Sequence, residues 1–130
     1  MGQPIAKQND QVIATDIHII MIPSPGGPVP TPLPHPFIGM LNGSLSSNVK
    51  AMGQFVAVVG STADNMPPHI PQGGPFQKPP TNKGTVMMGS PTVMVNNKPA
   101  ARNGDTVLTC NDPADLPVGS IIAVGTVMCA

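Results

Sequence analysis

The sequence predicts an all-β protein of short strands, and three observations favour that fold class. Helix signals are weak, because no window of about a dozen residues keeps a helical apolar period without a Pro or Gly interrupting it. Stretches of strand length that are rich in Val, Ile, Thr and Met recur between turn-forming residues. A segment that occurs twice favours a wound β architecture among the sandwiches, barrels and solenoids that short strands build.

Strands are expected at seven places along the chain. Turn-forming sequences such as Asn42-Gly43, Gly89-Ser90-Pro91 and Asn103-Gly104 lie between them. The expected strands cover residues 12–22, 55–59, 85–88, 92–95, 106–109, 121–124 and 126–128.

Two proline-rich stretches interrupt this pattern. Residues 22–36 contain seven Pro, and residues 66–80 contain six. Neither stretch is expected to pair as a central strand, because Pro has no backbone N–H to donate. Each holds one histidine between prolines, His35 or His69, so we expect ordered loops that build a site. A flexible linker or a polyproline II ligand is the alternative.

A nine-residue segment occurs twice. Residues 4–12 read Pro-Ile-Ala-Lys-Gln-Asn-Asp-Gln-Val, and residues 99–107 read Pro-Ala-Ala-Arg-Asn-Gly-Asp-Thr-Val. Asn or Gly stands where a left-handed backbone is tolerated, so the same turn-then-strand unit is expected twice. Because the pair Arg102 and Asp105 has a counterpart in the first copy, we expect an ion pair that stabilises the turn. Contact with a partner protein is the alternative.

The composition limits the classes of function. The chain has 130 residues, the length of one ordinary domain, and its six basic and six acidic side chains argue against a nucleic-acid or anionic-membrane surface. Residues 1–12 are polar and do not resemble a signal peptide, and no apolar run approaches the ~18 residues of a membrane span. Synthesis in the cytoplasm is therefore expected.

The core is expected to be thin, because the chain has three Phe and no Trp or Tyr. A small domain with such a core usually needs a disulfide, a metal or a partner to stabilise it. Cytoplasmic synthesis disfavours a disulfide between Cys110 and Cys129, and Cys129 lies at the penultimate position, where fraying is common.

Three histidines, His18, His35 and His69, and the internal Cys110 make up a candidate metal site. Three imidazoles and one thiolate form a complete tetrahedral shell for zinc. The spacings are long, so hydrogen-bonded structural or surface histidines are the alternative. The chain has no other histidine, and a metal would stabilise the thin core, so we favour the metal site.

Several segments resemble the PAAR family. Asn97-Lys98-Pro99-Ala100-Ala101-Arg102-Asn103-Gly104-Asp105 is similar to the proline-alanine-alanine-arginine signature of that family, and Gly89-Ser90 followed by Val93-Met94-Val95-Asn96 is similar to its lead-in. Residues 23–37 and 67–80 look like the proline-rich, histidine-bearing loops of a PAAR-like branch on injection-system and phage-tail spikes. The first copy departs from the signature, since it reads Ile5-Ala6-Lys7.

The resemblance implies a three-sided β-structure that tapers to a metal-pinned vertex, with residues 1–130 forming a single PAAR-like domain without a toxin extension. It implies that the metal, usually zinc, is held by His18, His35, His69 and Cys110, with iron as the alternative. The broad face would cap a trimeric β-helical spike, called VgrG in type VI secretion, one copy per trimer. The protein would then lie at the tip of the assembled injection particle, alone or with a non-covalently bound toxin, and be delivered outside or into the target cell.

Functions from three classes are compared. The leading hypothesis is a structural tip that aids membrane puncture. A zinc hydrolase is disfavoured, because catalytic zinc keeps an open water position and commonly uses a Glu as general base, whereas this chain has no Glu. A proline-rich adaptor is the third hypothesis, and rapid proteolysis within residues 22–36 would favour it.

Overall fold

The computed structural model describes residues 2–130 and confirms the all-β fold class. These residues form twelve strands and no helix. The strands are β1 (Gln3–Pro4), β2 (Gln11–Ile22), β3 (Val29–Gly43), β4 (Lys50–Ala51), β5 (Gln54–Phe55), β6 (Thr62–Asn65), β7 (Lys83–Val86), β8 (Met94–Val95), β9 (Lys98–Pro99), β10 (Thr106–Thr109), β11 (Leu116–Ile122) and β12 (Met128–Cys129). Within residues 2–130, a helix long and apolar enough to span a bilayer is absent.

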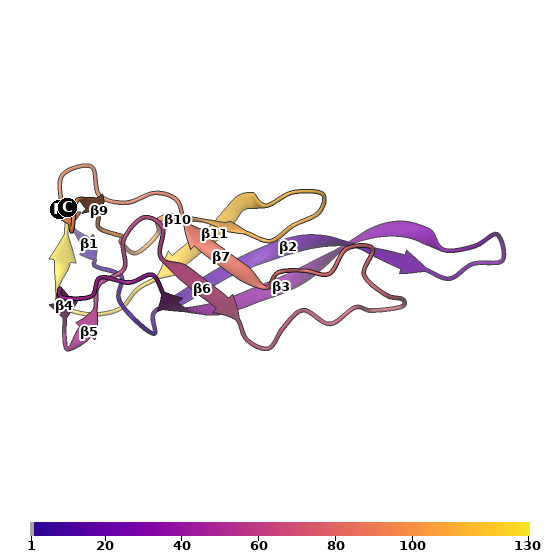
Figure 1. The fold of residues 1–130 in the computed structure, drawn as a ribbon, viewed down its shortest axis with the longest axis horizontal. Helices are drawn as coiled ribbons and strands as arrows, with labels where there is room; N and C mark the ends of the chain where they lie inside the picture. The colour runs from indigo at the N-terminus through magenta and orange to yellow at the C-terminus, as the bar shows by residue number, and fades with distance from the viewer. Residues whose placement is uncertain (1) are drawn as a thin grey trace.

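Six strands close into a barrel in the order β10-β11-β2-β3-β6-β7 (Figure 1). The barrel consists of three antiparallel hairpins, β2–β3, β6–β7 and β10–β11. Adjacent hairpins pair through β3 and β6, β7 and β10, and β11 and β2. Alternate residues of each strand point inward, as the period of a strand requires, and Val12, Phe37 and Leu41 are among those that fill the interior.

The repeated unit occurs three times in the structure rather than twice. Residues 55–63, Phe-Val-Ala-Val-Val-Gly-Ser-Thr-Ala, take the same place as residues 4–12 and 99–107. The third residues of the three units form a closed ring of backbone hydrogen bonds. Ala6 N donates to Ala101 O at 2.9 Å, Ala101 N donates to Ala57 O at 3.0 Å, and Ala57 N donates to Ala6 O at 3.0 Å. All three alanines are fully buried, so one ring of backbone contacts joins the three units.

Each unit turns in the same way. The turn residue has a positive φ, 73° at Asn9, 96° at Gly60 and 86° at Gly104. The next side chain accepts a hydrogen bond from the backbone N–H three residues earlier: Asp10 from Lys7, Ser61 from Val58 and Asp105 from Arg102. The turn therefore requires an acceptor at this position in all three units, and a carboxylate in only two.

The two carboxylates also form the expected ion pairs. Lys7 Nζ lies 3.1 Å from Asp10 Oδ1, and Arg102 Nη2 lies 2.8 Å from Asp105 Oδ1. The interpretation of Arg102 and Asp105 as a pair within the turn is thus confirmed.

Three short hairpins lie at one end of the barrel, which we call the base. They are β4–β5, β8–β9 and a pair formed by β1 with β12, so that residues near the two termini complete the third hairpin (Figure 1). Equivalent positions of these hairpins hold Ala51, Val95 and Cys129, all buried in one apolar cluster. Together the three hairpins repeat the threefold arrangement of the barrel.

Residues 22–36 do not pair as a central strand, as expected, but the expectation of a loop is wrong for residues 29–36. These residues belong to β3 and pair on one side only, with β2, because the pairing of β3 with β6 begins at Gly39. β3 pairs with β2 in unbroken register from Val29, opposite Ile22, to Met40, opposite Gln11. Its prolines stand at alternate positions, Pro30, Pro32, Pro34 and Pro36. The residues of β2 that lie opposite these prolines are the odd-numbered ones, and their N–H groups point away from β3. Met21 N, for example, donates to Pro75 O. Each proline therefore belongs to a pair of residues that exchanges no hydrogen bond between β2 and β3. Their missing N–H groups therefore cost the β2–β3 ladder nothing.

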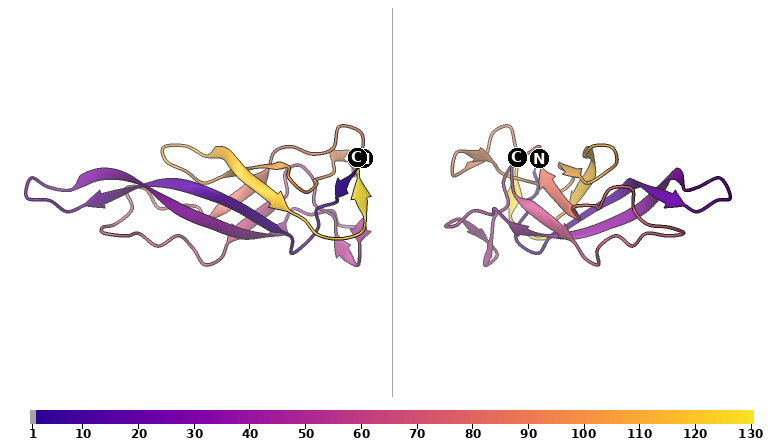
Figure 2. Two further views of the ribbon diagram at one scale, coloured as in Figure 1. Left: turned by 180° about the vertical axis from the view of Figure 1, so that it is seen from behind. Right: turned by 45° about the vertical axis from the view of Figure 1, so that its right-hand side comes forward.

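Residues 66–80 form a loop with one isolated bridge, between Phe76 and Ile20, as expected for this stretch. Beyond the barrel the β2–β3 hairpin extends past the rest of the chain, and the molecule narrows toward the turn at residues 23–28 (Figures 1 and 2). The base and the narrow end thus lie at opposite ends of the long axis.

The strands expected from the sequence agree in part with the strands of the structure. The strand at 106–109 matches β10, and 12–22 matches β2 within one residue. The expected strand at 55–59 is wrong beyond Phe55, because the chain there enters the second turn unit.

Candidate metal centre

Four segments place polar side chains inside the narrow half of the molecule. Asp16 and His18 lie two residues apart on β2, so both point inward. His35 lies directly opposite Asp16 on β3, Cys110 follows β10, and His69 comes from the loop between β6 and β7. All five side chains are buried.

The three imidazole rings converge. Their ring centroids are 4.9 Å apart for His18 and His69, 5.4 Å for His35 and His69, and 5.5 Å for His18 and His35. Phe76 covers the side toward the hairpin tip, 5.8 Å from His18 and 5.5 Å from His35 between ring centroids. The structure therefore brings together three histidines that are widely separated in the sequence.

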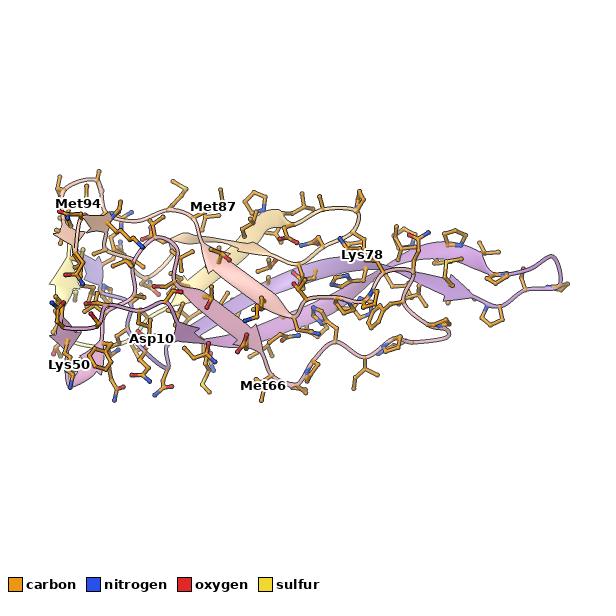
Figure 3. The ribbon with its side chains drawn as sticks, viewed as in Figure 1. Asp10, Lys50, Met66, Lys78, Met87 and Met94 are labelled. Atoms are coloured by element: carbon orange, nitrogen blue, oxygen red, sulfur yellow. The ribbon has the colours of Figure 1, made fainter. Side chains whose placement is uncertain are left out.

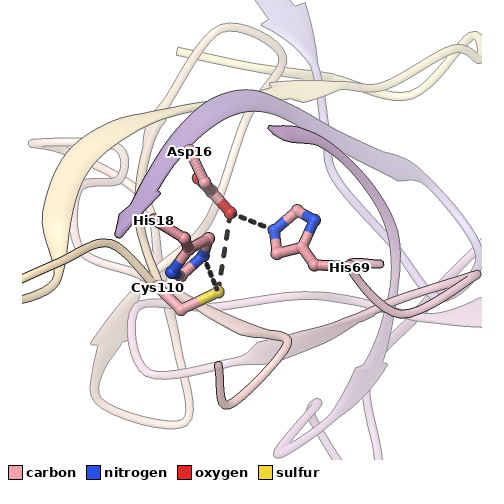
Figure 4. A group of neighbouring side chains, drawn as sticks. All are labelled: Asp16, His18, His69 and Cys110. Carbon is pink, nitrogen blue, oxygen red and sulfur yellow. Dashed lines mark hydrogen bonds and ion pairs between the residues drawn. The ribbon is translucent and has the colours of Figure 1, made fainter. Parts of the chain in front are cut away.

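The ligand atoms of Asp16, His18, His69 and Cys110 all lie within 4.8 Å of one another, and this group could hold a metal ion (Figure 4). Three of its members belong to the predicted set. Asp16 was not predicted, although Asp16-Ile17-His18 in an expected strand places two potential ligands on one face. His35 is not part of this group, and its Nδ1 lies 2.9 Å from the carbonyl oxygen of Leu33.

Asp16 is the centre of the hydrogen-bond network. Its Oδ1 accepts from Thr109 Oγ1 at 2.6 Å and from Asn111 Nδ2 at 3.4 Å. Its Oδ2 faces His69 Nε2 at 2.8 Å and Cys110 Sγ at 3.5 Å. A carboxylate with no exposed surface is thus held by side chains on three sides.

The donor set fits a divalent cation such as zinc or iron. Burial lowers the pKa of His18, which favours the neutral imidazole that binds metals. Its Nδ1 has no hydrogen-bond partner among residues 2–130, and Asp112 Oδ2 lies 3.5 Å away. On the other side of the ring, Nε2 lies 3.6 Å from Cys110 Sγ. Imidazole nitrogen, thiolate sulfur and carboxylate oxygen are all common ligands of zinc.

Cys110, His18 and Asp112 lie in the same sequence of contacts as the catalytic residues of a cysteine nucleophile site, with His18 between the thiol and the carboxylate. The thiol, however, lacks the reactivity that such a site requires. Burial, followed by the nearby charge of Asp16, raises the pKa of the Cys110 thiol to about 11. A nucleophilic cysteine needs a lowered pKa and access to substrate, whereas this thiol is 2% exposed. The geometry therefore favours metal binding over nucleophilic catalysis.

A surface pocket lies against one side of the centre. It is lined by prolines and by Ile38 and Ile70, and His35 and His69 form part of its wall.

The second cysteine lies elsewhere. Cys129 is buried in the apolar cluster of the base, and both cysteines are free thiols in the described part of the chain. The disulfide between Cys110 and Cys129 that the sequence disfavours is not formed within residues 2–130, where the two cysteines lie in separate clusters.

Comparison with known families gives one match. The model of the family described as the PAAR motif matches residues 77–129, which include the third turn unit and Cys110. No curated protein matches the chain in a sequence search.

Proposed function

Because the model of the PAAR motif matches residues 77–129, we propose that this chain is a PAAR-repeat protein and the structural tip that caps and sharpens the trimeric β-helical spike of a contractile injection system. The observation that carries the proposal is the threefold repetition within one chain. Three turn units, three barrel hairpins and three base hairpins repeat around the ring formed by Ala6, Ala57 and Ala101.

A partner with threefold symmetry matches such a base. Each subunit of a trimer presents the same edge around one axis, and the three base hairpins offer three similar edges in return. One copy of this chain would then bind one trimer end-on, with a stoichiometry of 1:3. A VgrG-type spike has the required form.

The exposed side chains of the base support an apolar interface. Met94 on β8 and Met128 on β12 hold equivalent positions and are 58% and 60% exposed, and Lys50 holds the corresponding position on β4. Figure 3 places Met94 and Lys50 at this end. With few charges at the contact, binding should depend only modestly on salt.

The narrow end supports a role in membrane puncture. Residues 17–49 contain no Asp, Glu, Lys or Arg, and they include the whole projecting hairpin. A leading element without charged groups meets a smaller desolvation cost when it is driven into a bilayer. The protein would act at the tip of the assembled particle, after synthesis in the cytoplasm.

The metal is proposed to be zinc and to stabilise the narrow half. Of the predicted ligands, His18, His69 and Cys110 lie in the cluster, and His35 is the predicted fourth. An ion there would join four chain segments and so supply the cross-link that a thin core needs. We propose a single domain, with no enzymatic activity; a non-covalent toxin cargo would be a separate partner.

Light scattering of the protein mixed with a trimeric β-helical spike fragment tests the function. We expect a 1:3 complex that survives moderate salt. The double variant Met94→Lys with Met128→Lys should abolish it, whereas Met66→Lys should not. Met66 is a matched control, since it is 64% exposed and lies outside the base (Figure 3). Failure of the unmodified protein to bind any trimeric spike would refute the proposal.

A further inference from the structure

We propose that Asp112 positions His18 for metal binding. Its carboxylate accepts the Nδ1 proton of the imidazole, so that Nε2 keeps its lone pair for the ion. The inference rests on the metal site proposed above and leaves its predicted ligands, His18, His35, His69 and Cys110, unchanged. Asp112 is thus assigned a contact with a ligand rather than with the metal.

The Nε2 atom of His18 is the nitrogen placed to bind the ion. It lies 3.6 Å from Cys110 Sγ. With zinc bond lengths of about 2.3 Å to sulfur and about 2.0–2.1 Å to nitrogen, two such ligands of one tetrahedral ion lie about 3.6 Å apart. His18 and Cys110 therefore already have the separation that a shared zinc ion requires.

The Nδ1 atom of His18 must then carry the proton, because a neutral imidazole that binds a metal through one nitrogen is protonated at the other. This nitrogen is buried and has no hydrogen-bond partner in the described part of the chain. A buried N–H without an acceptor is costly. Metal-binding histidines usually donate this N–H to a carboxylate, a carbonyl or water, which fixes the orientation of the ring.

Asp112 is in place to be that acceptor. Its Oδ2 lies 3.5 Å from His18 Nδ1, and the two side chains are only 4% and 1% exposed. A movement of about 0.5 Å would turn this contact into a normal hydrogen bond. The backbone of β2 holds the carboxylate there: Ile19 N donates to the same Oδ2 at 2.8 Å, and Asp112 N donates to Ile17 O at 2.8 Å. Asp112 is thus attached to the residues on both sides of His18.

His35 has the same arrangement with a different acceptor. Its Nδ1 lies 2.9 Å from the Leu33 carbonyl oxygen, which leaves its Nε2 free for a metal. Two of the three histidines therefore have an acceptor beside Nδ1, a backbone carbonyl for His35 and a carboxylate for His18. The carboxylate makes the stronger, charge-assisted hydrogen bond and so makes the imidazole a more basic ligand.

Zinc affinity, measured in the full chain by competition with a chromophoric chelator, is the first test. Asp112→Ala removes the acceptor and should weaken zinc binding about 10–100-fold, the range typical of groups that hold a ligand. Asp112→Asn keeps an uncharged acceptor oxygen and should weaken binding less. In a His18→Ala background, Asp112→Ala should weaken binding less than about twofold further, because its effect is exerted through His18.

NMR of the zinc-loaded, ¹⁵N-labelled protein separates this role from a merely structural one. The imidazole N–H proton of His18 should resonate downfield, as expected for a hydrogen bond to a carboxylate, and should move upfield in Asp112→Asn. The corresponding proton of His35, which faces the Leu33 carbonyl, is an internal control and should stay in place.

Asn111→Ala is the matched control for the backbone contacts. Asn111 Oδ1 accepts from Ile17 N at 2.7 Å, so this residue also holds β2 beside His18. Its Nδ2 donates to Asp16 and to the Thr109 carbonyl rather than to the imidazole. Asn111→Ala should therefore leave the His18 N–H signal at its wild-type position. Circular dichroism of each variant in chelator checks that the fold is retained.

The outcomes separate the two proposals. A wild-type protein that does not bind Zn²⁺ overturns the metal site and the inference together. If Zn²⁺ binds, an unchanged His18 signal in Asp112→Asn overturns the inference alone. Two further results do the same: an equal loss from Asp112→Ala with and without His18, and a His18 signal that moves as far in Asn111→Ala as in Asp112→Asn.

Discussion

Replacing Asp105 by Asn and by Ala separates two contributions to the turn unit. The carboxylate accepts a hydrogen bond from Arg102 N at 2.7 Å and also pairs with the guanidinium group at 2.8 Å. Asn keeps an oxygen for the backbone N–H but loses the charge, whereas Ala removes both interactions. Ser61, which fills the same position in the second unit without any charge, indicates that the backbone bond matters more.

The magnitudes follow from the contacts. An ion pair that is partly open to solvent contributes about 1 kcal/mol or less, so Asp105→Asn should lower the melting temperature by about 4 °C. Asp105→Ala loses this ion pair and also leaves an N–H beside the buried ring unsatisfied, which costs about 1–3 kcal/mol more, so it should lower the melting temperature by roughly 8–15 °C. Ser61→Ala should cost nearly as much as Asp105→Ala, since Val58 N then loses its acceptor and both Val58 and Ser61 are buried.

Differential scanning calorimetry of the three variants, with the exposed Ser47→Ala as control, measures these shifts. The reasoning fails if Asp105→Asn is as damaging as Asp105→Ala, because the ion pair would then dominate. It also fails if Ser61→Ala melts like the wild type.

Three further predictions concern the cysteines and the metal. Cys110→Ser should lose the metal and melt well below the wild type, because structural zinc can supply about 10–16 kcal/mol of apparent binding free energy; unchanged zinc content by elemental analysis would contradict this. Cys129→Ala should keep full metal content and a nearly wild-type melting temperature, since the equivalent position is already Ala51; a mass shift on reduction that reveals a Cys110–Cys129 bond would contradict it. Because the pKa of the Cys110 thiol is raised to about 11, the thiol is protonated at pH 7 and zinc must displace that proton. Zinc affinity should therefore rise about tenfold per pH unit above neutrality, and calorimetry in buffers of different ionisation enthalpy should detect the released proton.

Local physical chemistry made much of the fold predictable. The frequent Pro and Gly exclude long helices, and the β-rich runs predict β2 and β10 closely, because strand preference and turn preference act over a few residues. The turns at Lys7–Asp10 and Arg102–Asp105 could be found because their side chains bond to their own backbone, so each requires the same residues at the same spacing.

Three features could be recognised only in the tertiary structure, because each depends on contacts between residues that are far apart in the sequence. The second turn unit has lost its basic and acidic residues, and only the ring through Ala57 identifies it as equivalent to the other two. The prolines of β3 are tolerated because their nitrogens face away from β2, and the sequence alone does not say which side of a strand its partner occupies. Asp16 joins the histidines and Cys110 for the same reason: only barrel closure brings the inner face of β2 against residues more than 90 positions away.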